Sequence, residues 1–80
     1  MTVSLPELGE NLKLSRKYHF PNDTISDFAI RCEIGLSTYK KMEKGDLSVS
    51  VKHYFKAAKV LGQSSGFAEL FKLEEDWFNE

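Results

Sequence analysis

The sequence contains few of the residues from which metal sites and catalytic sites are built. It has one cysteine, Cys32, and two isolated histidines, His19 and His53. A single cysteine forms no internal disulfide, and these residues lack the spacing of zinc ligands. Neither histidine has the Ser, Cys or acidic partner that catalysis requires. We therefore expect no metal, no cofactor and no enzymatic activity, and we expect Cys32 to be a small buried apolar residue.

Long hydrophobic runs are also missing. No apolar stretch approaches the roughly 18 to 20 residues that span a bilayer. The N-terminal stretch, MTVSLPELGEN, lacks the basic region and the apolar segment of a signal peptide. A chain of 80 residues can build one modest core but not a cleft between two layers, as most enzymes have. We expect a single domain over residues 1–80, located in the cytoplasm and without membrane contact.

The chain has no large excess of either charge, since its formal net charge is −1. The charges are unevenly distributed, however. Residues 1–60 carry ten Lys/Arg and seven Asp/Glu, whereas residues 61–80 carry one and five. Such asymmetry is compatible with a basic face toward phosphate and an acidic face turned away from it.

Apolar residues at helical spacing are plentiful. Leu5, Leu8 and Leu12 form one such series, and the stretch from Val51 to Leu61 carries another. Together with capping residues and glycine stops, the spacing predicts helices at about residues 5–18, 24–32, 36–44, 50–61 and 65–78. No segment has a convincing strand pattern, so we predict an all-α fold of five helices.

Residues 24–45 form the most informative stretch, TISDFAIRCEIGLSTYKKMEKG. Two helices that cross at a steep angle need a small residue where their backbones approach, and Ala29 is suitably placed. Ile34 then fills the turn, Tyr39 and Met42 anchor the second helix in the core, and Gly45 provides a left-handed stop. The other face of residues 36–44 is left outward, a geometry that lets the start of this helix enter a DNA major groove.

With this pattern the sequence resembles the Xre/Cro-type helix-turn-helix repressor family, whose domain is lambda-repressor-like. The family has a small residue followed by apolar residues at +5, +10 and +13, Glu at +14 and Gly at +16. The corresponding residues here are Ala29, Ile34, Tyr39, Met42, Glu43 and Gly45. The resemblance covers roughly residues 5–62 and implies that Arg16 pairs with Glu43, which would tie the first helix to the third. The structural set is thus Arg16, Ala29, Ile34, Glu43 and Gly45.

The resemblance also implies which residues contact DNA. The base-reading positions fall on Leu36, Ser37 and Lys41, whose side chains suit a thymine methyl, either base type and guanine, respectively. The expected phosphate contacts are Thr24, Lys40, Lys44, Ser50 and Lys52. Two residues depart from the family pattern. Ile25 stands where a glutamine is common, and Glu33 replaces the turn glycine and adds a negative charge near the groove.

The last 18 residues, 63–80, combine acidic and aromatic residues. We expect a C-terminal helix there whose apolar stripe exceeds what a small monomer buries. The stripe would serve a dimer or partner interface through Phe67, Leu70, Phe71, Trp77 and Phe78. A purely intrachain core is the alternative.

The resemblance favours a transcriptional repressor or autorepressor that binds a pseudo-palindromic operator in double-stranded DNA as a homodimer. Residues 42–50 and 60–62 look most like HipB-type antitoxins, which also bind a HipA-like kinase toxin. A phage Cro-like repressor and a restriction-modification controller remain alternatives within the family. A protein-interaction module that has lost DNA binding is the alternative from another class, favoured by Ile25 and Glu33.

Overall fold

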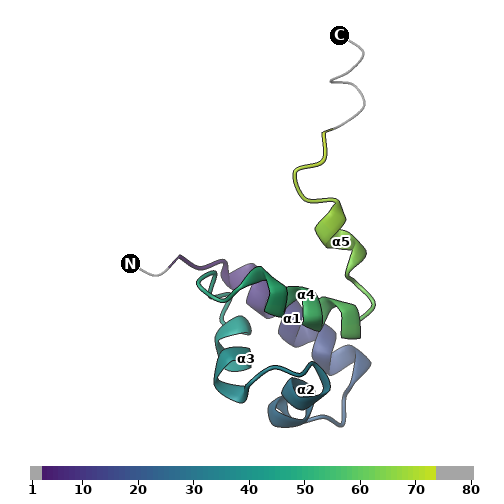
Figure 1. The fold of residues 1–80 in the computed structure, drawn as a ribbon. Helices are drawn as coiled ribbons and strands as arrows, with labels where there is room; N and C mark the ends of the chain where they lie inside the picture. The colour runs from purple at the N-terminus through teal and green to yellow at the C-terminus, as the bar shows by residue number, and fades with distance from the viewer. Residues whose placement is uncertain (1–2, 74–80) are drawn as a thin grey trace.

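The chain folds into helices joined by short turns, as a computed structural model describes for residues 3–73 (Figure 1). The helices are α1 (Pro6–His19), α2 (Ile25–Arg31), α3 (Leu36–Met42), α4 (Val51–Val60) and α5 (Ser65–Ala68). Residues 3–73 contain no strand, only an isolated β-bridge between Ser4 and Asp46. The predicted all-α fold of five helices is confirmed, and the first four helices lie within two residues of their predicted bounds.

Three of the helices begin at residues that suit a helix start, and two of these are side-chain caps. α1 starts with Pro6, which fits a first helical turn because that position needs no N–H donor. Thr24 caps α2 through a reciprocal pair: its hydroxyl oxygen accepts from the Asp27 N–H at 3.0 Å, and its own N–H donates to the Asp27 carboxylate at 3.1 Å. Ser50 caps α4 by accepting a hydrogen bond from the Lys52 N–H at 3.2 Å.

Three helices end on a residue with left-handed backbone: Glu33 after α2 (φ 59°), Gly45 after α3 (φ 75°) and Gly62 after α4 (φ 73°). Each is part of a Schellman motif. After α2, for example, the Ile34 N–H donates to the Ala29 carbonyl at 2.9 Å. Three consecutive helix ends are therefore set by local hydrogen bonding.

The core lies between α1, α2, α3 and α4. Phe28 of α2 and both Tyr39 and Met42 of α3 are its largest fully buried side chains. The ring of Phe28 is 5.5 Å from the rings of Phe20 and Tyr39, measured between centroids. Edge and tilted contacts of this kind add to the free energy of burial. The orientation of α3 is therefore fixed by residues from its own buried face.

α1 lies against the end of α3 at very short range. A Cβ atom on Gly9 would lie 2.4 Å from the Glu43 carbonyl oxygen, so only glycine permits this approach. The residues before α1 pair with the turn after α3: the Leu5 N–H donates to the Gly45 carbonyl at 2.8 Å, and the Leu47 N–H donates to the Val3 carbonyl at 2.9 Å. No local sequence pattern signals this pairing.

The predicted helix at 65–78 within the C-terminal segment 63–80 is wrong in its extent, because α5 ends at Ala68 and Phe71 is left-handed (φ 62°). Residues 69–73 form turns and irregular chain. Gly66 disfavours helix here, and a helix of four residues is marginal without packing. α5 extends away from α1 to α4, and none of its residues is buried (Figure 1). The predicted interface residues Trp77 and Phe78 lie outside the described residues.

Candidate nucleic-acid interface

α2 and α3 are joined by a tight turn. Each of the two helices has one face in the core and the opposite face toward solvent. Ala29, Ile34, Tyr39 and Met42 are all buried, as the spacing predicted. Ile34, the residue that follows the left-handed Glu33, places its side chain in the core between the two helices. These four residues form the packed scaffold of the α2–α3 pair.

The outward face of α3 is polar and basic. Ser37, Lys40 and Lys41 are exposed, as is Lys44 in the turn that follows. Leu36, at the start of the helix, is 40% exposed. Within residues 3–73, none of these three lysines forms an ion pair. The predicted base-reading residues Leu36, Ser37 and Lys41 are thus all accessible, and the lysine charges are available to an anion.

Arg16 and Glu43 form the interhelical pair that the resemblance implies. Arg16 Nε donates to Glu43 Oε2 at 2.7 Å, and the two side chains are only 7% and 10% exposed. Tyr39 Oη donates to the same carboxylate oxygen at 2.6 Å. The hydrogen bond to Glu43 raises the pKa of the Arg16 guanidinium, whereas burial raises the pKa of the Tyr39 hydroxyl. α1 is thereby tied to α3 by a charge-assisted network.

Two of the predicted phosphate contacts, Thr24 and Ser50, also cap helices. Each hydroxyl oxygen accepts a backbone N–H, which leaves its O–H free to donate to a phosphate oxygen. Lys52 is exposed in the first turn of α4. The expected phosphate contacts therefore come from the start of α2, the outward side of α3 and its following turn, and the start of α4.

The turn before α4 is held by its own polar contacts. Asp46 Oδ1 accepts from the Ser48 N–H at 2.8 Å and from Ser48 Oγ at 2.6 Å. These two hydrogen bonds lower the pKa of the Asp46 carboxyl. Tyr54 Oη donates to the Asp46 carbonyl at 2.6 Å, so α4 fastens the turn from the other side.

The two departures from the family pattern have different structural roles. Ile25 is half-buried and packs against the core, so it replaces a polar contact with packing. Glu33 is exposed at the α2–α3 turn, with a backbone conformation that side chains rarely adopt. Its carboxylate adds negative charge beside α3 and opposes an approaching anion.

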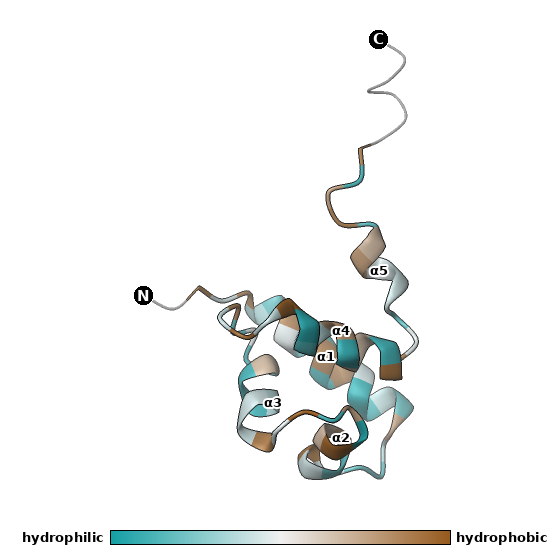
Figure 2. Cartoon of the chain, viewed as in Figure 1, coloured by the Kyte–Doolittle hydropathy of each residue, from teal (hydrophilic) through white to brown (hydrophobic). Residues whose placement is uncertain are grey.

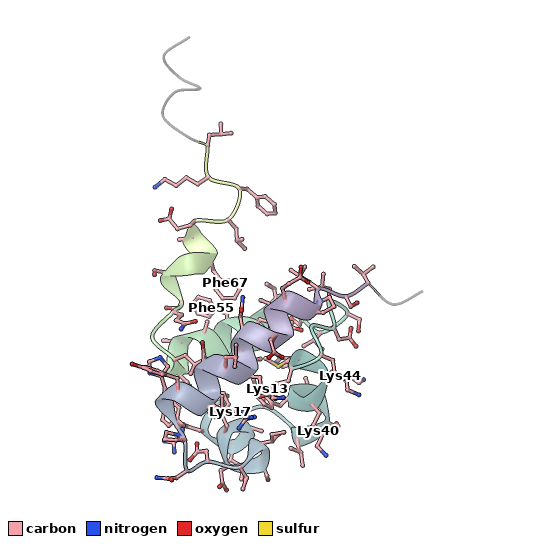
Figure 3. The ribbon with its side chains drawn as sticks, turned by 180° about the vertical axis from the view of Figure 1, so that it is seen from behind. Lys13, Lys17, Lys40, Lys44, Phe55 and Phe67 are labelled. Atoms are coloured by element: carbon pink, nitrogen blue, oxygen red, sulfur yellow. The ribbon has the colours of Figure 1, made fainter. Side chains whose placement is uncertain are left out.

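Sequence reasoning missed two basic residues that the fold brings beside α3. Lys13 and Lys17, one turn apart on α1, lie on the same side of the domain as Lys40 and Lys44 (Figure 3). We call these four residues the α1–α3 lysine face. The signal in the sequence was the position of Lys13 and Lys17 on either side of Arg16, the residue expected to contact the end of α3.

An apolar groove of about 630 Å³ lies on another part of the surface, between α1, α4 and α5. Its hydrophobic lining includes Leu5, Leu8, Leu47, Val51, Phe67 and Leu70. Figure 2 shows the hydrophobic residues of α5 and of the segment before α1 in brown. Phe67 packs on Phe55 of α4 with ring centroids 5.5 Å apart (Figure 3). Of the predicted interface residues, Phe67, Leu70 and Phe71 thus line this groove.

Cys32 is a core residue, and burial raises the pKa of its thiol to about 11. Within residues 3–73, no three His, Cys, Asp or Glu side chains are placed to hold a metal ion. No helix in the same part of the chain is long and apolar enough to cross a membrane.

Comparisons with protein-family models, with curated proteins and with solved structures find no match.

Proposed function

We propose that this protein is a sequence-specific DNA-binding transcriptional regulator that inserts α3 into the major groove. The observation that carries the proposal is the outward face of α3, where Ser37 and Lys41 are exposed while Tyr39 and Met42 on the opposite side are fully buried. Lysine and serine donate to base edges, and the exposed part of Leu36 suits a thymine methyl. Repression of its own operon is the regulatory role that the family resemblance favours.

Base reading needs a helix whose position is fixed before DNA arrives, because flexible contacts lose specificity to entropy. The buried hydrogen bonds among Arg16, Tyr39 and Glu43 supply that rigidity, since they join α1 to the last turn of α3. The close contact of Gly9 with the Glu43 carbonyl also holds α1 rigidly against the end of α3. α3 is short, and its orientation depends on these supports.

We propose that the protein binds DNA as a homodimer, with a second copy covering the apolar groove. Five large apolar side chains that line the groove are exposed: Leu5, Leu47, Val51, Leu70 and Phe71. Their exposed area is on the order of 600 Å², approaching the ~800 Å² that each partner buries in a standard interface. A two-fold pairing through this face would leave both copies of α3 free to reach successive half-sites about one helical turn apart.

Other predicted partners stay predictions. A HipA-like kinase toxin would bind at the same apolar groove, either in place of the second copy or beside it. A Cro-like or restriction-modification role would require no such partner. The cytoplasmic location also stays a prediction. The protein-interaction alternative is favoured by Glu33, whose exposed carboxylate lies at the edge of the α3 surface that would face DNA.

The test is a selection from randomised 30-base-pair duplexes, followed by a binding titration with the selected duplex and a scrambled one. We expect the wild-type chain to prefer the selected duplex by about 10³-fold or more at physiological salt. Ser37→Ala and Lys41→Ala should each reduce that preference by about 5- to 100-fold. Lys59→Ala, a charge removal on exposed α4 surface, is the matched control and should preserve it.

Three results would decide against the proposal or parts of it. No selected sequence, or equal affinity for both duplexes, would favour the interaction module. If Ser37→Ala and Lys41→Ala both leave the preference for the selected duplex unchanged, α3 is not the helix that contacts the bases. Light scattering tests the dimer: we expect Phe71→Asp to give monomers, and a wild-type monomer at tens of micromolar would contradict the pairing.

A further inference from the structure

The α1–α3 lysine face surrounds the interhelical ion pair. Lys13 and Lys17 lie three residues before and one residue after Arg16, and Lys40 and Lys44 have the same relation to Glu43. Residues one turn apart are about 6 Å apart along a helix axis. Since Arg16 and Glu43 neutralise each other, the charge that this part of the surface presents comes from the four lysines (Figure 3).

These lysines are not balanced by ion pairs. The ion pairs within residues 3–73 involve Arg16, Arg31 and Lys72, and none of the four lysines takes part in one. Glu10, one turn before Lys13 on α1, is the acidic residue that adjoins the face on that helix. Lys17, Lys40 and Lys44 are exposed, and Lys13 is half-buried. Lys13 and Lys17 on α1 and Lys40 and Lys44 on α3 and its following turn repel one another, and an anion placed across both elements relieves that repulsion.

The relative placement of the two lysine pairs is rigid. The Gly9 approach and the 2.7 Å bond from Arg16 to Glu43 fix α1 against the end of α3. A helix that lies in a major groove has a phosphate strand along each flank, and α1 crosses α3 at its C-terminal end, where Gly9 and Arg16 contact Glu43. The partner that this arrangement fits is an extended polyanion rather than a single phosphate group.

We infer that the DNA phosphate backbone runs across the α1–α3 lysine face, so that Lys13 and Lys17 of α1 bind phosphates next to those bound by Lys40 and Lys44. This inference rests on the proposed DNA-binding function and adds α1 to the elements that contact DNA. The lysines of α1 would add to the affinity for DNA and would not contribute to the choice of sequence. Contacts to phosphate strengthen binding to every sequence alike and steepen its dependence on salt.

The experiment compares two double variants of the full chain, Lys13→Gln/Lys17→Gln and Lys59→Gln/Lys72→Gln, which remove the same charge. Lys59 lies on α4 and Lys72 beyond α5, so the second variant controls for net charge. The probes are the selected and scrambled 30-base-pair duplexes carrying fluorescein, and anisotropy is measured from 50 to 300 mM NaCl. Circular dichroism with urea verifies that both variants are folded.

For the α1 variant we expect the slope of log K against log salt to be shallower by about 1.8 for each bound protomer, which is 0.9 for each of the two phosphates that the protomer no longer binds, and so by about 3.6 for the homodimer. At 0.1 M salt its affinity should fall by roughly 10- to 60-fold for each bound protomer, on both duplexes, with the preference between them unchanged. Lys17→Gln alone should lower the slope by about 0.9 for each bound protomer. The control variant should keep the slope of the wild-type chain.

Two outcomes overturn the inference, and they are distinguishable from failure of the proposed function. If the α1 variant has the same slope as the control while Ser37→Ala still impairs the selected duplex, DNA does not cross α1 and the face serves another anion, such as an acidic protein. If the α1 variant loses preference rather than affinity, its lysines read bases. Failure of the proposed function would appear instead as no duplex binding by the wild-type chain, which would overturn both.

Discussion

Removing the Glu43 carboxylate should cost the protein a large part of its stability. In Glu43→Ala, the Arg16 guanidinium would remain charged in a place where its side chain is 7% exposed, and Tyr39 Oη would lose its acceptor. Breaking a buried ion pair from one side costs about 3 to 5 kcal/mol. A chain of 80 residues has a free energy of unfolding of about 4 to 12 kcal/mol. The variant should therefore lose about a quarter of its stability or more.

Urea unfolding followed by circular dichroism at 222 nm measures this loss. Tyr39→Phe removes only the hydroxyl, so we expect a smaller loss of about 1 to 2 kcal/mol. Arg16→Met/Glu43→Leu removes both charges and should recover most of the stability that Glu43→Ala loses, because no unpaired charge remains. A loss below about 1 kcal/mol for Glu43→Ala would refute this reasoning, since the pair would then behave as an exposed one.

Residues at the α2–α3 turn supply two further predictions. Glu33→Gly should raise the free energy of unfolding by about 0.5 to 1 kcal/mol, because φ is 59° at this position and glycine adopts that conformation without strain; an unchanged urea midpoint would contradict it. Burial raises the pKa of Cys32 to about 11 from an ordinary value near 9, so the folded state holds the proton more tightly and stability should fall as pH rises from 9 toward 11. The fall should be roughly 2 to 3 kcal/mol and smaller in Cys32→Ala, and equal pH profiles for both proteins would argue against it.

The scaffold could be predicted from the sequence because each of its parts leaves a local signal. Ala29, Ile34, Tyr39 and Met42 follow helical spacing, and Thr24 and Gly45 mark a helix start and stop. The pairing of Arg16 with Glu43 came from the family resemblance, since no local pattern relates residues so far apart in the chain. The first four helices could therefore be placed within two residues.

The parts that could not be predicted depend on contacts distant in sequence. The apolar stripe after Ser65 favours a long helix, but α5 ends at Ala68 because its apolar residues do not pack against α1 to α4 over a longer stretch. Lys13 and Lys17 stand on a helix whose sequence pattern indicates only a structural role. Their place beside α3 depends on how α1 crosses it, and Gly9 permits that crossing only through the absence of a side chain.

The pairing of Val3 and Leu5 with the turn after α3 has a practical consequence. The start of the described chain lies beside Gly45 and Leu47, which come about forty residues later in the sequence. A fluorophore attached at Val3 would therefore report on the end of α3, and its signal would change when that turn meets another molecule. For the same reason, a bulky fusion partner ahead of Val3 would crowd the turn, so a label meant to be inert belongs elsewhere on the chain.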